Sequence, residues 1–391
     1  MESLPLEIII EISWALMSTT DLKNFRLVSK AFAYAASPAL FHHVQAINTA
    51  ECLEQLYESQ NYNKSPASAA RHLTLYHGTW PYLGSFNEWK THPQALSHDD
   101  LCKQAEMEAF VAYRRFSTQE AARVFDSDVS GLAMILEMFP SLATLTLSHV
   151  HTWRWGKFKS AYYNELCQKT RIIPFFKARV EDLACRLLPS LLRFPQITSL
   201  NIPSTLDIQN DEWIVINENI VSLNVSNLVV RGYEHSEVQQ FLRSFPNLQE
   251  LVLCTESGGQ ASSQRIDLRS LKWPTLRRAH FRHLWTSEND LIDFVCQHQL
   301  QQLALRNVTL FSGTWKSFFH RVVRLSNQTL QSAVCIKTSG IRVSLSEAAR
   351  SHKRWPNSDA SSLPTRVYLV FGKCNTDPVY SLDKRDFWLA E

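Results

Sequence analysis

The chain has 391 residues, of which 45% are hydrophobic and 20% charged, and its formal net charge is only +3. This near-balance argues against general binding to a nucleic-acid backbone, which depends on clustered, uncompensated lysines and arginines. The 10 glycines form no glycine-rich phosphate-binding motif, so we expect neither a nucleotide-binding loop nor a cofactor.

The sequence carries no signal that predicts export or membrane insertion. The first apolar stretch, residues 8–17, is interrupted by Glu11 and Ser13 and follows no basic segment. No apolar run reaches the roughly 18 to 20 residues of a membrane span. The eight cysteines are scattered without a C-x-x-C pair, which is typical of reduced thiols. We therefore expect a cytoplasmic or nuclear protein that does not bind membranes.

Residues 1–46 are predicted to form three short helices. Apolar residues recur at four-residue intervals at Leu4, Ile8, Ile12 and Leu16. This spacing predicts an amphipathic helix, with Pro5 in its first turn. The Thr19-Thr20-Asp21 tract predicts a second helix that begins near Asp21, and Ser37-Pro38 predicts the start of a third. Three such helices could hardly be stable alone, so they need a partner surface.

The same segment resembles an F-box. It contains Leu4-Pro5-Leu6-Glu7-Ile8, then Asp21-Leu22, then Arg26 to Phe32, and these follow the family pattern L-P-x-E-[IL], D-L and R-x-V-[CS]-K with a nearby aromatic residue. The resemblance implies that these helices bind a Skp-type adaptor, which carries the protein into a cullin-RING ubiquitin ligase. The adaptor-binding residues that it implies are Leu4, Pro5, Ile8, Ile9, Ile12, Leu22, Leu27, Val28, Lys30 and Phe32.

Three residues depart from this pattern. Ser29 replaces the commoner Cys, Phe32 replaces the commoner Trp, and Ser13 stands where an apolar residue usually follows Ile12. Each change removes apolar surface, and we expect a small hydroxyl at such a position to weaken packing by roughly 1 kcal/mol or more. The alternative interpretation of the segment is a helical hairpin that packs onto the body of the chain.

Residues 47–138 are predicted to join the helices to that body. Ala70, Leu73 and Leu75 fit the pattern of an early repeat-like strand. Residues 77–93 are predicted as an aromatic-rich loop. Residues 99–116 and 117–139 are predicted as two helices that form an insertion, the second opening with a capping box at Ser117 and Glu120.

The body contains an irregular repeat of apolar residues at positions x, x+3 and x+5. Its copies begin at Leu142, Ile197, Ile220, Leu248, Leu276 and Leu300. The starts are 55, 23, 28, 28 and 24 residues apart. The last four intervals fit the range of leucine-rich repeats, roughly 20 to 29 residues, and the first is about two such units. Phe-Pro or Trp-Pro precedes four copies, where proline ends the preceding helix and fixes the entry to a strand.

Helix-like stretches lie between these strands. They are residues 179–194, 236–245, 287–297 with Ser287 as N-cap, and 314–325. One strand and one helix per unit predict an α/β solenoid. The expected domains are an F-box at 1–46, the joining segment 47–138 with its helical insertion, an irregular leucine-rich-repeat array at 139–345, and a C-terminal cap at 346–391 with a strand at 367–371. This organisation resembles that of fungal F-box proteins with leucine-rich repeats; an unrelated α/β stack is the alternative.

Candidate catalytic and metal-binding residues are few. His149 and His151, or His280 and His283, could ligate a metal, but no other close Cys or His pair completes a zinc site. The sequence has no G-x-S-x-G elbow and no cysteine-enzyme motif, and a repeat scaffold offers an open surface rather than a deep pocket. We therefore expect no metal, no catalytic residue and no enzymatic activity.

A stretch near residues 153–177 interleaves aromatic and basic residues. Such interleaving is typical of single-stranded nucleic-acid binding, but Trp, Tyr and Arg are also enriched at protein-binding hot spots. We favour an unknown target protein, bound by Trp153, Trp155, Tyr162 and Tyr163. The predicted function is the substrate-recognition subunit of a Skp-cullin-F-box ubiquitin ligase. The alternative is a repeat scaffold or a nucleic-acid-associated interaction protein without a role in a ligase.

Overall fold

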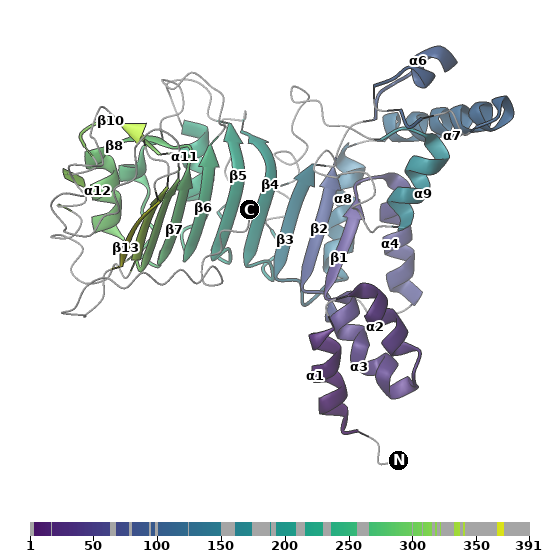
Figure 1. Ribbon diagram of the computed structural model, residues 1–391, viewed down its shortest axis with the longest axis horizontal. Helices are drawn as coiled ribbons and strands as arrows, with labels where there is room; N and C mark the ends of the chain where they lie inside the picture. Colours follow the sequence, from purple (N-terminus) through teal and green to yellow (C-terminus); the bar gives the residue numbers. More distant parts are fainter. Residues whose placement is uncertain are drawn as a thin grey trace. The chain divides into compact units, whose positions relative to one another are not determined.

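The computed structural model describes residues 4–16, 18–62, 68–77, 80–93, 95–97, 101–123, 125–149, 161–173, 188, 193–208, 216–229, 236–255, 266–298, 300–306, 308–314, 317–318, 321, 332–336, 339–340 and 366–370. The chain has an α/β fold with parallel strands (Figure 1). It divides into two compact units, Met1–Val229 (unit 1) and Val230–Glu391 (unit 2). No helix among the described residues has the length and apolar character needed to cross a membrane.

Unit 1 begins with three helices, α1 (Leu6–Ala15), α2 (Thr19–Arg26) and α3 (Lys30–Phe41). Ser18 caps α2 by accepting hydrogen bonds from the amides of Thr20 and Asp21, and Ser29 caps α3 by accepting one from the amide of Phe32. The prediction that a helix begins at Ser37-Pro38 is wrong, because Pro38 lies inside α3. The Ser37 hydroxyl is not a cap, since it donates back to the Ala33 oxygen within the same helix.

Strands of unit 1 follow one another in chain order as parallel neighbours. They are β1 (His43–Ile47), β2 (His72–His77), β3 (Thr144–His149), β4 (Ser199–Asp207) and β5 (Ser222–Val229). Leu73, Leu145, Leu200 and Leu223 occupy matching positions on adjacent strands, and all four are buried. The strand β1 was not predicted. Because it covers His43–Ile47, the expected end of the helical segment at residue 46 lies within a strand of the sheet.

Further helices of unit 1 are found among its described residues. They are α4 (Ala50–Tyr62), α6 (Phe86–Lys90), α7 (Lys103–Ala121), α8 (Phe125–Glu137) and α9 (Ala161–Thr170). The helix α4 was not predicted, and the expected loop 77–93 contains α6. A capping box begins α6, where the Ser85 hydroxyl accepts from the amide of Glu88 and the Glu88 carboxylate accepts from the amide of Ser85.

The predicted capping box at Ser117 and Glu120 is wrong. Both residues lie inside α7, and the Ser117 hydroxyl donates to the Arg114 oxygen one turn earlier. Glu120 instead accepts from the amide of Ala50 at 3.0 Å and forms an ion pair with Arg123 at 2.6 Å. A Ser-x-x-Glu pattern is therefore compatible with a helix interior when both side chains find other partners.

Unit 2 contains two sets of parallel strands. The first consists of β6 (Glu250–Thr255), β7 (Arg278–Arg282), β9 (Gln302–Arg306) and β11 (Ser332–Ile336), with β13 (Arg366–Val370) antiparallel to β11. The second set, which was not predicted, consists of β8 (Trp285–Ser287), β10 (Thr309–Ser312) and β12 (Ser339–Gly340). The strand β13 matches the prediction at 367–371.

Helices of unit 2 separate several of these strands. They are α11 (Ser236–Arg243), the 3-10 helix η3 (Leu268–Ser270) and α12 (Glu288–Gln297). The predicted N-cap of α12 is confirmed, since the Ser287 hydroxyl accepts from the amide of Asp290 at 3.0 Å. The helices predicted at 179–194 and 314–325 lie mostly outside the described residues.

The repeated apolar positions form the cores of the two units. In all six copies, the residues at x, x+3 and x+5 are at most 2% exposed. The turn that enters the strand recurs as well. The amides of Leu142, Ile197 and Leu276 donate to the oxygens of Phe139, Phe194 and Trp273. Proline is the second residue of each turn, where its fixed φ is favourable. The predicted strands and three of the four predicted entry turns are therefore confirmed.

Candidate functional site

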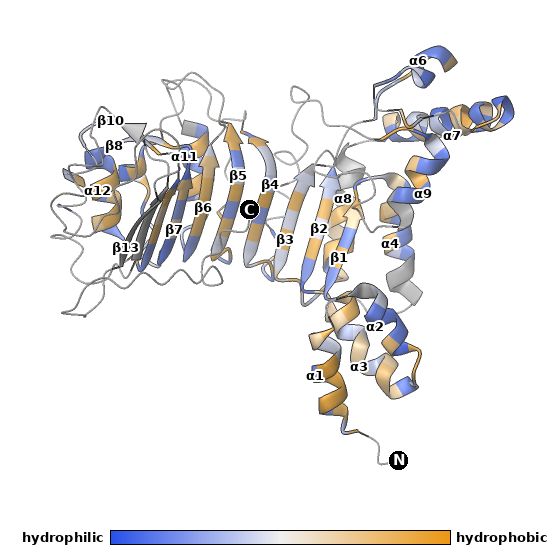
Figure 2. Ribbon diagram, in the orientation of Figure 1, coloured by the Kyte–Doolittle hydropathy of each residue, from blue (hydrophilic) through white to orange (hydrophobic). Residues whose placement is uncertain are grey.

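Large apolar side chains are unusually exposed on the three N-terminal helices. Among the described residues, 14 large apolar side chains are exposed, and eight of them lie within residues 4–34. We refer to these eight exposed residues together as the apolar face: Leu4, Leu6, Ile8, Ile12, Trp14, Leu27, Val28 and Tyr34. Helix periodicity places Ile8 and Ile12 on one side of α1 and Leu6 and Trp14 on others. Figure 2 shows α1 as a largely apolar helix. Single exposed apolar residues are common, but a concentration of this kind is typical of a protein-binding surface.

The helix α1 exposes its apolar stripe because it packs through a different side. Ile9 and Ser13, one turn apart, are buried, whereas Ile8 and Ile12 are 41% and 37% exposed. The Ser13 hydroxyl donates to the oxygen of Ala35 in α3 at 3.1 Å. The contact on α3 is made by small residues, which leaves little apolar surface for α1 to cover.

The loop between α2 and α3 presents two more members of the apolar face. Leu27 is 84% exposed and Val28 is 65% exposed. Their backbone amides donate to the oxygens of Asn24 and Phe25 at 3.0 and 3.2 Å. Beneath the loop, the rings of Phe25 and Phe32 are 4.6 Å apart. Both apolar side chains are therefore held outward by an ordered turn.

The structure gives the ten predicted adaptor-binding residues different positions. The exposed ones are Leu4, Pro5, Ile8, Ile12, Leu27, Val28 and Lys30, and Phe32 is half-buried. Ile9 and Leu22 are buried within the bundle, so they support it and cannot be reached by a partner. Leu6, Trp14 and Tyr34 were missed by sequence reasoning. For Leu6 and Trp14 a signal was present, because apolar residues surround most of the helix axis at residues 6–15.

Histidines join the three helices to the sheet of unit 1. The backbone oxygen of His42 accepts hydrogen bonds from the amides of Arg71 and His72 at 2.9 and 3.0 Å. The His42 ring lies 5.2 Å from the ring of Trp14 and 4.6 Å from that of His72. Burial lowers the pKa of His42, and Arg71 lowers it further. The same side chain therefore contacts both α1 and β2.

The predicted target-binding residues cannot be placed as a group. Trp153 and Trp155 lie outside the described residues, and Tyr162 and Tyr163 belong to α9 with their side chains outside the described part. His151 is also outside it. Within the described part, no group of three or more His, Cys, Asp or Glu side chains is arranged to hold a metal ion.

Comparison with known proteins assigns no family. No protein-family model matches the chain, and no curated protein sequence is a significant match to it.

Proposed function

We propose that the chain is the target-binding subunit of a Skp-cullin-F-box ubiquitin ligase, with α1–α3 as an F-box-like unit that binds the adaptor. The observation that supports this most is the apolar face. Five of its members, Leu4, Ile8, Ile12, Leu27 and Val28, occupy positions where the F-box pattern implies adaptor contacts. Full burial of one such side chain contributes roughly 1.5–3 kcal/mol, so a partner that covers this face would be bound favourably.

We further infer that the strands belong to an irregular leucine-rich-repeat solenoid. Support comes from the buried x, x+3 and x+5 residues and from the parallel, chain-ordered pairing of strands within each unit. Repeats of this kind form extended surfaces that bind other proteins. In this proposal, such a surface binds the target protein.

The proposed contribution to ubiquitin transfer is proximity. The apolar face holds the adaptor, the strands hold the target, and the target is thereby kept near the ubiquitin-charged enzyme. Bimolecular transfer then becomes effectively intramolecular, with a correspondingly higher effective concentration. The chain itself makes and breaks no bond in this mechanism.

The experiment that tests this function measures equilibrium binding of the purified full-length chain to a Skp-type adaptor by calorimetry. The test variant is Ile8→Gln with Ile12→Gln, which removes two neighbouring members of the apolar face. The matched control is Met107→Gln with Val111→Gln. These two residues have the same four-residue spacing on α7 and are 49% and 59% exposed. Glutamine favours helices and adds no charge, so both variants should stay folded.

We expect the test variant to weaken adaptor binding by about tenfold or more, because two partly exposed side chains lose their burial. The control should bind within about twofold of the wild type. Equal losses in both variants would indicate non-specific apolar association and contradict the proposal. A wild-type chain that does not bind the adaptor would favour a repeat scaffold without a ligase role.

A further inference from the structure

Three histidines lie where the N-terminal helices meet the sheet of unit 1. His42 lies between α3 and β1, His43 is the first residue of β1, and His72 is the first residue of β2. Figure 1 shows α1–α3 next to the start of β1. Strand pairing makes His43 and His72 register partners, so all three side chains gather at one point. We call these three side chains the histidine joint.

The rings of the histidine joint lie against one another. The centroid of the His72 ring is 4.6 Å from that of His42 and 6.2 Å from that of His43. The His42 ring also lies 5.2 Å from the ring of Trp14 in α1, and the Nε2 of His43 is 2.7 Å from the Thr74 hydroxyl. Centroid distances of this size are typical of aromatic rings in contact. The joint is therefore a packed cluster in which three rings can take a proton.

The attachment of the helices to the strands depends on this joint. Among the described residues, α1, α2 and α3 pack mainly against one another. The backbone of the joint connects them to the sheet, because the His42 oxygen accepts from the amides of Arg71 and His72. Its side chains form a second connection, from Trp14 through His42 to His72. A change at the joint would therefore alter how the helices are held.

The surroundings of the histidine joint disfavour its protonation. Burial has the largest effect and lowers the pKa of all three rings. The charge of Arg71 lowers the pKa of His42 further, and His42 in turn lowers the pKa of the other two rings. Another cation, Arg26 of α2, lies 5.5 Å from the ring of Phe41, the residue before the joint. The charged groups beside the joint are therefore cations.

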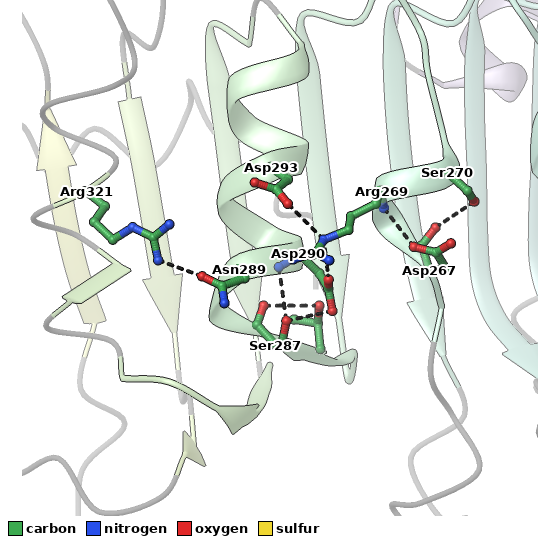
Figure 3. Close-up of polar contacts among 9 residues, drawn as sticks. Asp267, Arg269, Ser270, Ser287, Asn289, Asp290, Asp293 and Arg321 are labelled. Carbon is green, nitrogen blue, oxygen red and sulfur yellow. Dashed lines mark hydrogen bonds and ion pairs between the residues drawn. The ribbon is translucent and has the colours of Figure 1, made fainter.

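No carboxylate of the described residues offsets these cations at the joint. A carboxylate stabilises a neighbouring cation, as Figure 3 shows in unit 2, where the Nε of Arg269 lies 2.7 Å from Asp290 and 2.8 Å from Asp293. The acidic residues of α1 in the described part, Glu7 and Glu11, form no ion pair with the joint. Protons on neighbouring rings of the joint would therefore repel one another without compensation.

We propose that the histidine joint is a pH-sensitive switch, which holds α1–α3 against the strands of unit 1 at neutral pH and releases them in acid. Uncharged rings pack against one another and against Trp14. Protons on two or three rings bring like charges into contact beside Arg71, and release of the helices separates those charges. The inference goes beyond the function proposed above, because it concerns how the helices are attached and not what they bind.

The direction of the pH effect follows from the linkage between proton binding and conformation. The ordinary pKa of an imidazole is 6.5, and each ring of the attached joint has a lower pKa. The released form therefore binds more protons below pH 6.5, and the attachment weakens as the pH falls. At pH 5.5, one ring that regains its ordinary pKa favours release by up to about tenfold, and three rings act together.

The test measures hydrogen exchange of single backbone amides in the full-length chain at pH 7.5 and pH 5.5, corrected for the intrinsic effect of pH on exchange. The reporter amides are those of Arg71 and His72, which lose the His42 oxygen on release. The reference amides are those of Ala143 and Thr144, which donate to the Arg71 oxygen in the same arrangement between later strands. At pH 5.5, the reporters should lose protection by about tenfold or more, and the references by less than about twofold.

The test variant is His43→Gln with His72→Gln, which leaves one ionisable ring in the joint. Its reporter amides should stay protected at pH 5.5. The matched control is His92→Gln, which removes a ring outside the joint whose pKa burial also lowers, and it should respond as the wild type does. A further variant, His72→Lys, places a permanent charge in the joint and should lower reporter protection by about tenfold already at pH 7.5. Circular dichroism checks that all variants are folded.

Several results would overturn this inference. They are reporter protection that does not change with pH in the wild type, equal losses in reporters and references, and an equal response of the wild type and the double glutamine variant. If that variant is unprotected at both pH values, His72→Lys is compared with His72→Gln at pH 7.5, and equal protection in these two rejects the switch. None of these measurements contains the adaptor, so they leave the test of the ligase role independent.

Discussion

The hydroxyl of Ser13 in α1 donates to the backbone oxygen of Ala35 in α3 at 3.1 Å, at a point where both residues are buried. The Ile10 oxygen, 2.7 Å away, is a second acceptor for the same hydroxyl proton. The F-box pattern has an apolar residue at position 13, so we expected from the resemblance that Ser13 weakens the packing of α1. The structure gives this hydroxyl two backbone acceptors. From the burial of the small residues Ala35 and Ala36 on α3, we infer that a branched side chain would not fit at position 13.

Substitution of Ser13 tests this relationship. We expect Ser13→Ala to destabilise the helix bundle by about 1 kcal/mol, the usual contribution of one buried hydrogen bond. Ser13→Val should cost about 1–3 kcal/mol, because it forces extra volume between closely packed backbones. Hydrogen exchange of the α1 and α3 amides measures both changes locally. A more stable valine variant would contradict the proposed lack of space.

Trp89 anchors the outer helices of unit 1. Its side chain is fully buried against Leu83, Phe110 and Tyr113, and its Nε1 donates to the Thr170 oxygen at 3.0 Å. We expect Trp89→Ala to lower the free energy of unfolding by about 3–5 kcal/mol. Tyr82→Ala, a change to a 74% exposed aromatic side chain nearby, should alter it by less than about 0.5 kcal/mol. Urea unfolding compares the two, and similar losses would contradict this assignment.

Two glycines should respond oppositely to alanine. Gly313 has φ of 88°, and a Cβ there would overlap the side chain of Glu288, which accepts from the amide of Thr314 at 2.7 Å. Gly313→Ala should therefore destabilise the chain by about 2 kcal/mol or more. Gly131 lies inside α8 with open space around it, so Gly131→Ala should stabilise it by about 0.5–1 kcal/mol. Thermal unfolding would contradict this if both variants shifted in the same direction.

The buried ring of His280 predicts a pH dependence. Its pKa is lowered to about 3 in the folded chain, against an ordinary value of 6.5. Between these values the unfolded chain binds the additional proton, so stability is lost as the pH falls below 6.5. This group alone should remove about 2 kcal/mol between pH 6.5 and pH 5. His280→Gln should flatten the urea-unfolding profile by that amount, and parallel profiles for the two proteins would contradict the prediction.

Sequence patterns predicted the buried strands well because each shows the x, x+3 and x+5 apolar spacing, and four of the six copies also have a proline entry turn. The strand β8 escaped prediction because apolar alternation is weak over three residues. The strand β1 has five residues, as β7 and β9 do, but it crosses the end of the segment 1–46 that was predicted to be helical. Helix boundaries were predicted wrongly where a hydroxyl that could cap a helix bonds instead to a backbone oxygen within the helix. Ser37 and Ser117 satisfy their hydroxyls within a continuing helix, so residue types that favour caps did not mark helix ends.

The candidate site was only partly predictable for a related reason. The four-residue spacing of Leu4, Ile8 and Ile12 identified an apolar stripe on α1. Whether that stripe would face α3 or solvent depended on residues more than twenty positions away, above all Ala35 and Ala36. The neighbouring positions of His43 and His72 were equally hidden, because they result from the register of β1 with β2.

A single residue, His42, separates the end of α3 from the start of β1. The backbone amides of Arg71 and His72 donate to its backbone oxygen, so the connection between the helices and the sheet is not a flexible linker. Any molecule bound by α1–α3 would therefore have one fixed orientation relative to the strands of unit 1. The distance from that molecule to the strands of unit 1 would then be fixed by the fold. Insertion of a few flexible residues after His42 would leave binding by α1–α3 intact but remove this fixed orientation.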